Sequence, residues 1–254
     1  MTRAIYLLFG VLAYLIFFAT FLYLIAFVGN LPWVPITVDR GGIAGPASLA
    51  LIVDSALIAL FGLQHSIMAR QGFKTAWTRI VPKPIERSMY VLLASLVLII
   101  LFLMWRPMTM TIWSVGNPIA ANLIWILFAA GWGIVLLSTF LLSHFELFGL
   151  HQVWSHSRGT NIPEPQFRQP LLYRWVRHPL YAGFFLAFWA TPQMSAGHLL
   201  LALGMSAYML IAIRYEERDM VGLFGKDYVD YQDRVGMLTP RLRRTSSQGE
   251  AVRN

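Results

Sequence analysis

The chain has 254 residues, of which 57% are hydrophobic and only 13% are charged. A soluble domain carries about 25% charged residues, so this composition indicates a membrane protein. The net charge is +8 at pH 7 and there is no cysteine, which excludes disulfides and thiolate metal sites. Because the basic residues lie between apolar runs, their charge indicates membrane topology rather than nucleic-acid binding.

Four apolar runs are long enough to span a bilayer, which requires about 20 predominantly apolar residues. They cover about 4–28, 48–69, 88–105 and 119–143. The first run is too long for a signal-peptide core and has no small-residue cleavage site after it, so we expect a retained transmembrane helix. A fifth apolar region, about 180–213, is interrupted at Pro192 and Gly197. Proline breaks or kinks a helix, which predicts a helical hairpin with arms at about 180–191 and 197–213.

The basic residues are distributed very unequally between the two sides of this topology. Of the 20 Lys and Arg residues, 18 fall on one side, and only Arg40 and Arg106 fall on the other. The positive-inside rule therefore predicts that both termini are cytoplasmic. The predicted fold class is an all-α membrane protein: four transmembrane helices plus a C-terminal helical hairpin around Pro192. Its cytoplasmic head consists of about 144–178 and the tail from 214, within a single domain covering 1–254.

Two polar motifs fall on the cytoplasmic side, one on each flank of the hairpin. The first runs Arg177-His178-Pro179-Leu180-Tyr181-Ala182-Gly183, and the second contains Glu216-Glu217. A carboxylate pair at the end of an apolar helix is costly against lipid, so it should face water, a basic partner or a ligand. Taken singly, each motif has a simpler interpretation, namely local ion pairs for the glutamates and headgroup contacts for the Arg and His. Their occurrence together on the same side favours a functional site.

The same residues carry a resemblance. The first motif, the glutamate pair and the following Phe224, Gly225, Tyr228 and Tyr231 resemble the C-terminal half of isoprenylcysteine carboxyl methyltransferase-like membrane enzymes. The resemblance implies an S-adenosylmethionine site facing the cytosol and a substrate taken from the lipid phase. It covers about 145–240, which makes 145–240 the predicted cofactor-binding half and 241–254 a flexible basic tail. The matching residues that it assigns to the cofactor are Arg177, His178, Pro179, Tyr181, Gly183, Glu216 and Glu217. We add His151, Gln152 and Tyr173 to the predicted cofactor site because they lie in or beside the cytoplasmic segment before the hairpin.

Segments of the first half narrow the resemblance. They are Phe27–Asn30, Leu63–Arg70, Ile85–Ser95 and His144–Leu150, and they resemble the bacterial methanethiol S-methyltransferase family along nearly the whole chain. That resemblance implies methyl transfer from S-adenosylmethionine to methanethiol, giving dimethyl sulfide. It also implies an integral protein of the bacterial cytoplasmic (inner) membrane, with a small thiol and membrane lipids as partners.

Polar residues within apolar spans are candidates for the chemistry. The catalytic candidates are Gln64 and His65, which end the second span, and His144. Asp54 shares a helix face with His65 but lies three turns away. His144 and His151 share a face if the fourth helix continues, but they are too far apart to chelate one ion, and no cluster has zinc spacing, so we predict no metal. Structural roles in interhelical hydrogen bonding or capping remain open for His65 and His144.

Three other functions remain open from the residues alone. The first is a methyltransferase of the same architecture acting on a prenylated or phospholipid substrate. The second is a membrane reductase that uses a nicotinamide cofactor, because sterol reductases share a weaker version of the motif. The third is a membrane assembly or transport protein, although the chain has no internal repeat of the kind typical of transporters.

Overall fold

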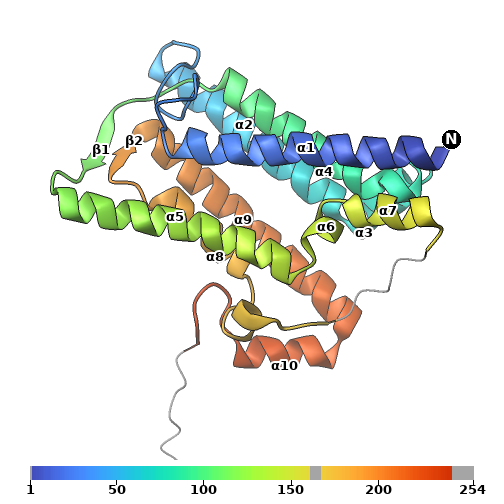
Figure 1. Ribbon diagram of the computed structural model, residues 1–254. Coiled ribbons are helices and arrows are strands. Elements are labelled where there is room, and N and C mark those ends of the chain that lie inside the picture. Colours follow the sequence, from blue (N-terminus) through green and yellow to red (C-terminus); the bar gives the residue numbers. More distant parts are fainter. Residues whose placement is uncertain (1, 161–166, 242–254) are drawn as a thin grey trace, which may run out of the picture.

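The computed structural model describes residues 2–160 and 167–241 as a bundle of long helices (Figure 1). Five helices in these ranges are long and apolar enough to cross a membrane. They are α1 (Thr2–Val28), α2 (Ala47–Ala69), α4 (Lys83–Met104), α5 (Pro118–Leu141) and α9 (Ala196–Phe224). Many of their apolar side chains are exposed on the outside of the bundle, as expected for surfaces that contact lipid.

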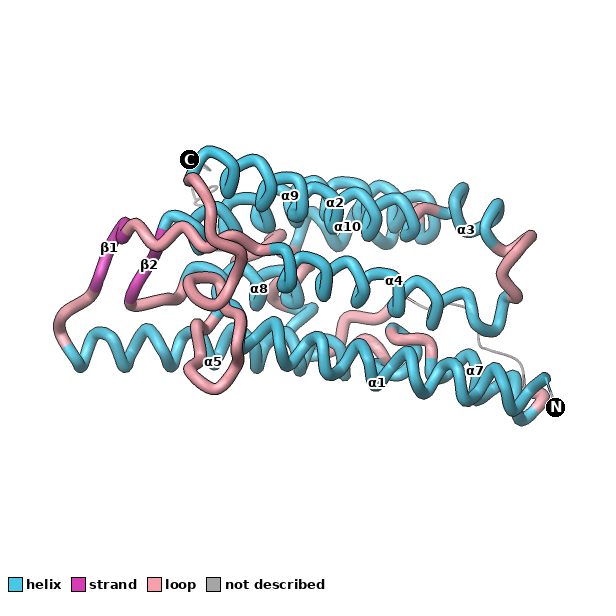
Figure 2. The backbone as a smooth tube through the Cα atoms, turned by 90° about the horizontal axis from the view of Figure 1, so that it is seen from above, coloured by secondary structure: helices cyan, strands magenta, loops and turns pink. Residues whose placement is uncertain are grey.

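Shorter elements connect and cover the long helices. They are α3 (Gln71–Trp77), β1 (Thr111–Ser114), α6 (His144–Leu147), α7 (Leu150–Arg158), the 3-10 helix η1 (Leu171–Arg174), α8 (Pro179–Trp189), β2 (Gln193–Ser195) and α10 (Lys226–Arg234). The strands β1 and β2 pair antiparallel at the end of the bundle opposite the N-terminus (Figure 2). The sequence did not indicate these strands or the short helices α3, α6 and α7.

The hairpin forms around Pro192, with α8 and α9 as its two arms. Its arms are unequal, because α8 has only 11 residues while α9 has 29 and continues past the predicted end at 213. Ser195 caps α9 by accepting a hydrogen bond from the backbone N–H of His198 at 3.0 Å. The extension carries the glutamate pair on the last turns of a continuous helix.

The fourth helix does not continue beyond 143, which was the condition for His144 and His151 to share a face. Helix α5 ends at Leu141, and Ser143 adopts a left-handed conformation with φ 75°. This turn separates α5 from α6 and α7, so His144 and His151 do not lie on one helix. Helix α7 packs instead against α1 and α4.

The cofactor assignment of Gly183 has a different structural explanation. This glycine is buried where α8 crosses α5, and a Cβ added to it would lie 2.8 Å from the carbonyl oxygen of Gly131. Gly131 faces the same restriction from the backbone of α8. The two glycines therefore allow the close packing of α5 against α8. The predicted basic tail, 241–254, lies outside the described residues except for Arg241.

Candidate active site

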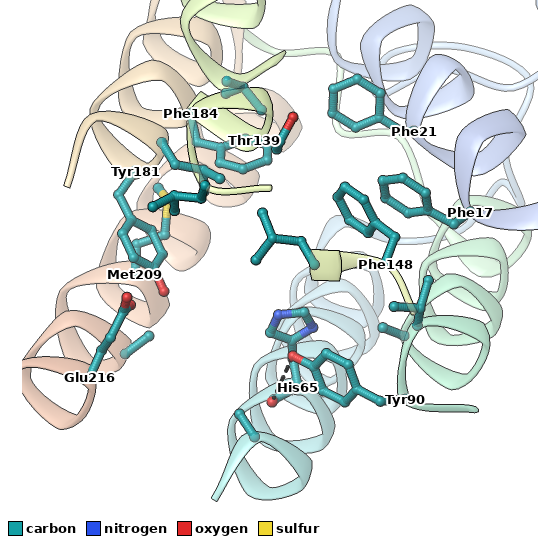
Figure 3. A pocket seen from close by; sticks show the side chains of 18 of the residues that line it. Phe17, Phe21, His65, Tyr90, Thr139, Phe148, Tyr181, Phe184, Met209 and Glu216 are labelled. Carbon is teal, nitrogen blue, oxygen red and sulfur yellow. Dashed lines mark hydrogen bonds between the residues drawn. The ribbon is translucent and has the colours of Figure 1, made fainter. Parts of the chain in front are cut away.

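A cavity of about 530 Å³ lies within the bundle, toward the end that holds α3, α6 and the last turns of α9. Its interior is apolar and aromatic, with side chains from α1, α2, α4, α5, α8 and α9. Figure 3 shows Phe17 and Phe21 on one wall and Tyr181 and Phe184 on another. Charged side chains also line it: Arg70, Lys74, Arg87, Arg177, Glu216 and Asp219. The cavity therefore combines an apolar interior with a charged mouth.

The two sides of the mouth carry opposite charges. Lys74 and Arg87 come from α3 and α4, whereas Glu216 comes from α9. None of these three belongs to an ion pair within residues 2–160 and 167–241, although Arg70 and Asp219 pair across the mouth at 3.0 Å. Burial and the neighbouring Arg87 cation lower the pKa of Lys74 below its ordinary value. A bound anion would stabilise the protonated form of the Lys74 amine.

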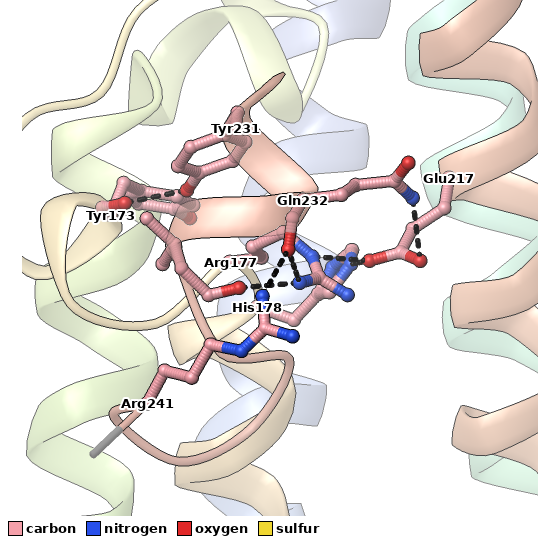
Figure 4. A network of polar contacts seen from close by, with 8 residues as sticks. Tyr173, Arg177, His178, Glu217, Tyr231, Gln232 and Arg241 are labelled. Carbon is pink, nitrogen blue, oxygen red and sulfur yellow. Dashed lines mark hydrogen bonds and ion pairs between the residues drawn. The ribbon is translucent and has the colours of Figure 1, made fainter. Parts of the chain in front are cut away.

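The Arg177-His178 motif, which lines the cavity, is held by a polar network (Figure 4). Arg177 donates from Nε to Glu217 Oε1 at 2.7 Å and from Nη1 to the carbonyl of Gln232 at 3.0 Å. His178 Nε2 lies 3.0 Å from the same Glu217 oxygen. The Gln232 side chain donates to the other Glu217 oxygen, also at 3.0 Å. Glu217 is thus the centre of the network.

The C-terminal segment completes this network. The backbone N–H groups of Arg177 and His178 donate to the carbonyls of Gly236 and Met237, at 2.8 and 3.0 Å. In addition, Tyr231 donates its hydroxyl hydrogen to the carbonyl of Tyr173 at 2.5 Å. Burial raises the pKa of Tyr231 to about 12, so this hydroxyl keeps its proton. The segment after α10 therefore fixes the loop that carries the first motif.

The predicted cofactor residues separate into two groups. Tyr173, Arg177, His178, Tyr181 and Glu216 line the cavity. Glu217, Pro179, Gly183, His151 and Gln152 do not line it. Of these, Glu217 belongs to the network, and Gln152 donates to the carbonyl of Glu146 at 3.0 Å. His151 and Gln152 lie on α7, which packs against α1 and α4.

The catalytic candidates also differ in position. His65 lines the cavity, with ring centroids of Phe61, Tyr90 and Tyr208 at 5.2, 5.0 and 6.2 Å. Its Nδ1 is buried and has no hydrogen-bond partner in the described part of the chain. Gln64 is turned away from the cavity, and its amide donates to the sulfur of Met68 at 3.0 Å.

His144 lines the cavity but has partners on both ring nitrogens. Thr139 Oγ1 donates to the carbonyl of Leu136 at 2.7 Å and lies 2.8 Å from His144 Nδ1. Because the hydroxyl hydrogen is already donated, Nδ1 is the donor to Thr139, and Nε2 accepts from Tyr14 at 2.9 Å. Burial lowers the pKa of His144, which favours this neutral form. The imidazole therefore bridges α1 and α5.

Several residues of the site were not identified from the sequence. Lys74 was counted only as a topological charge, and Tyr208 was not considered. Arg87 and Tyr90 lie in the Ile85–Ser95 segment that carries the resemblance, but neither was given a role in the site. The signal that could have found them is helical spacing, since Arg87, Tyr90, Val91, Ala94 and Leu98 recur at intervals of three and four on one face of α4. That face lines the cavity.

No protein-family model matches the chain, and no solved structure matches it. It is similar to methanethiol S-methyltransferase of Mycobacterium tuberculosis, with 50% identity over 240 residues, 94% of this chain and 98% of the relative. Methanethiol S-methyltransferase 1 of Bradyrhizobium diazoefficiens is 53% identical over 237 residues, 93% of this chain and 82% of the relative. The Crocosphaera subtropica methanethiol S-methyltransferase is 43% identical over 246 residues, 97% of this chain and 96% of the relative. With such identity along nearly the whole of these relatives, the chain belongs to the methanethiol S-methyltransferase family.

Proposed function

We propose that this membrane protein methylates methanethiol to dimethyl sulfide, with S-adenosylmethionine as the methyl donor. The observation that carries this proposal is the cavity, which joins a mouth of opposed charges to an apolar interior. The similarity to methanethiol S-methyltransferases favours this substrate over a prenylated lipid or a nicotinamide-dependent reduction. When bound, S-adenosylmethionine supplies an electrophilic methyl group on a sulfonium.

The residues at the mouth fit the amino-acid part of such a donor. Lys74 and Arg87 are suited to a carboxylate, and Glu216 is suited to an ammonium group. Tyr173 and Tyr181 add aromatic surface between this mouth and the interior. Glu216 and Tyr181 lie next to each other on one wall, with His65 and Tyr90 across the cavity (Figure 3). We assign cofactor binding to the residues of the mouth. In this assignment, Arg177, His178 and Glu217 hold the wall of the cavity in place.

The apolar interior is the proposed thiol site. Phe61, Tyr90 and Tyr208 surround His65 there, and they exclude water from the nucleophile. Since the thiolate is the reactive form, His65 is our candidate for accepting the thiol proton. Holding the reactants in line can contribute about 7–11 kcal/mol to lowering the barrier. The aromatic walls serve this alignment.

We further propose that the charged mouth faces the cytoplasm of a bacterial inner membrane. The support is the distribution of basic residues. Among the Lys and Arg of residues 2–160 and 167–241, only Arg40 and Arg106 fall in the connections α1–α2, α4–α5 and α8–α9. Single-cysteine variants in proteoliposomes, labelled with a membrane-impermeant reagent, test this orientation. Because the native chain has no cysteine, each label reports one position.

The activity test is incubation of the purified protein with S-adenosylmethionine and a panel of thiols, followed by headspace analysis of methylated sulfides. Methanethiol should give dimethyl sulfide, ethanethiol should react more slowly, and long alkyl thiols should fail. One methylene is worth only about 1–3 kcal/mol of discrimination, so the ethanethiol difference should be moderate. Calorimetry should show binding of S-adenosylhomocysteine but no binding of a nicotinamide dinucleotide. Efficient methylation of a prenylcysteine or a phospholipid would contradict the proposal.

A further inference from the structure

Two helices that do not pack along each other, α1 and α5, form one side of the cavity. Helix α1 packs along α4 and α7, and α5 packs along α8, whereas the backbones of α1 and α5 hardly approach each other. Both helices lie on the same face of the bundle (Figures 1 and 2). At the end near β1 and β2 the seam is closed, because Gly29 lies against the ring of Phe128.

Two further contacts bridge the seam nearer the mouth. Phe21 and Trp132 meet edge to face with ring centroids 5.5 Å apart. Tyr14 and His144 are joined by the hydrogen bond of 2.9 Å. From Tyr14 to Phe21 is two turns of α1, which leaves a stretch of roughly 10 Å between these contacts.

Within that stretch, the same side chains line the cavity and reach the outer surface. Phe18 and Leu136 line the cavity, and they are 39% and 42% exposed. Leu142, just after α5, also lines the cavity and is 40% exposed. At these positions the side of the cavity is therefore formed by apolar side chains that the neighbouring helices leave partly uncovered. These three residues form what we call the seam window.

We infer that the seam window is a passage through which methanethiol enters from the bilayer and dimethyl sulfide leaves, with Phe18 and Leu136 as its gate. This inference rests on the proposed function. Both sulfur compounds are small and apolar, and only apolar side chains form the window, so their transit costs no desolvation of charge. The charged mouth is separate, since Lys74, Arg87 and Glu216 lie on α3, α4 and α9. The cavity thus has an opening for polar ligands and another for apolar ones.

The absence of native cysteine allows a direct test. Leu136→Cys and Phe18→Cys are prepared in proteoliposomes and labelled with a bulky maleimide, and excess reagent is removed before methanethiol is added. Leu137→Cys and Leu22→Cys are matched controls, because Leu137 and Leu22 are 44% and 50% exposed on the same helices but do not line the cavity. Each labelled variant is compared with its own unlabelled form.

We expect labelling at the window to reduce methanethiol turnover about tenfold while S-adenosylhomocysteine affinity changes by less than about twofold. Labelling of the controls should leave both values unchanged. Equal turnover for labelled Leu136→Cys and labelled Leu137→Cys would overturn the passage but leave the proposed function intact. A fall in cofactor affinity at the window would also overturn it, because the label would then act through the mouth. If the unlabelled wild type forms no dimethyl sulfide, the proposed function fails, and the passage fails with it.

Discussion

The adjacent glutamates on α9 should respond to the same substitution in opposite ways. Glu217 accepts hydrogen bonds from Arg177, His178 and Gln232, and its side chain is only 15% exposed. Glu216 lines the cavity mouth and forms no ion pair within the described ranges. We therefore expect Glu217→Gln to destabilise the fold, and Glu216→Gln to weaken cofactor binding without destabilising it.

The magnitude for Glu217 follows from its partners. Hydrogen bonds to charged groups contribute about 1.5–3 kcal/mol each, and breaking a buried pair costs about 3–5 kcal/mol. Arg177 keeps the backbone carbonyls of Gln232 and Val235 as acceptors, and glutamine can still accept, so we expect a loss of about 3 kcal/mol. For a chain of this size that corresponds to about 6–12 °C in Tm.

The assay combines thermal unfolding in detergent with calorimetric titration of S-adenosylhomocysteine. Glu216→Gln should unfold within about 2 °C of the wild type, since exposed substitutions change stability by about 0.5 kcal/mol or less. Its affinity should fall about tenfold, as expected for loss of a charge-assisted hydrogen bond. The division of roles is refuted if Glu216→Gln lowers Tm as much as Glu217→Gln does, or if Glu216→Gln binds the ligand with wild-type affinity.

Three more predictions concern the mouth, the interior and the seam. Because the pKa of Lys74 is lowered, Lys74 loses its charge as pH rises through that lowered value, and S-adenosylhomocysteine affinity should fall with the charge. Lys74→Arg should keep the affinity at alkaline pH. Identical pH profiles of affinity for the wild type and Lys74→Arg would exclude Lys74 from anion binding. His65→Ala should lower kcat about 10²–10⁴-fold while the cofactor still binds; near-wild-type activity across neutral pH would remove His65 from the mechanism. Tyr14→Phe removes the donor to His144 and should lower the free energy of unfolding by about 0.5–1.5 kcal/mol. The control is Tyr6→Phe on the same helix, which removes a hydroxyl without a hydrogen-bond partner among the described residues, and its Tm should stay above that of Tyr14→Phe. Because the pKa of His144 is lowered in the folded protein, its contribution to stability is fully present above the ordinary histidine pKa. That contribution is lost as the pH falls below the ordinary value and through the lowered one.

The parts of the fold predicted from the sequence are those set by long apolar runs. The first four predicted spans agree with α1, α2, α4 and α5 to within a few residues at most ends, because about 20 apolar residues leave the backbone few alternatives to a helix. The break at Pro192 was also predicted correctly, because proline cannot continue the hydrogen-bond ladder. The left-handed turn at Ser143 could not be predicted, because neither glycine nor proline marks it in the sequence.

The site could be predicted only as far as its motifs. Tyr173, Tyr181 and Glu216 were named from their segments, and the structure brings them to one cavity. The roles within a motif could not be separated, because adjacent glutamates point about 100° apart on a helix and only packing decides which one meets the cavity. Asp54 illustrates the same limit. It shares a helix face with His65, yet it does not line the cavity and accepts a hydrogen bond from the backbone N–H of Arg106 at 3.0 Å.

The hydrogen bonds from the backbone of Arg177 and His178 to Gly236 and Met237 determine the order in which parts of this protein can form during synthesis. Chains are synthesised and begin to fold from the N-terminal end. All five long helices therefore leave the ribosome before the segment that fixes the cavity wall. A nascent chain that has reached only Phe224 has its helices but lacks the acceptors at 232–237, so the ability to hold the cofactor should appear only in the last stage of translation.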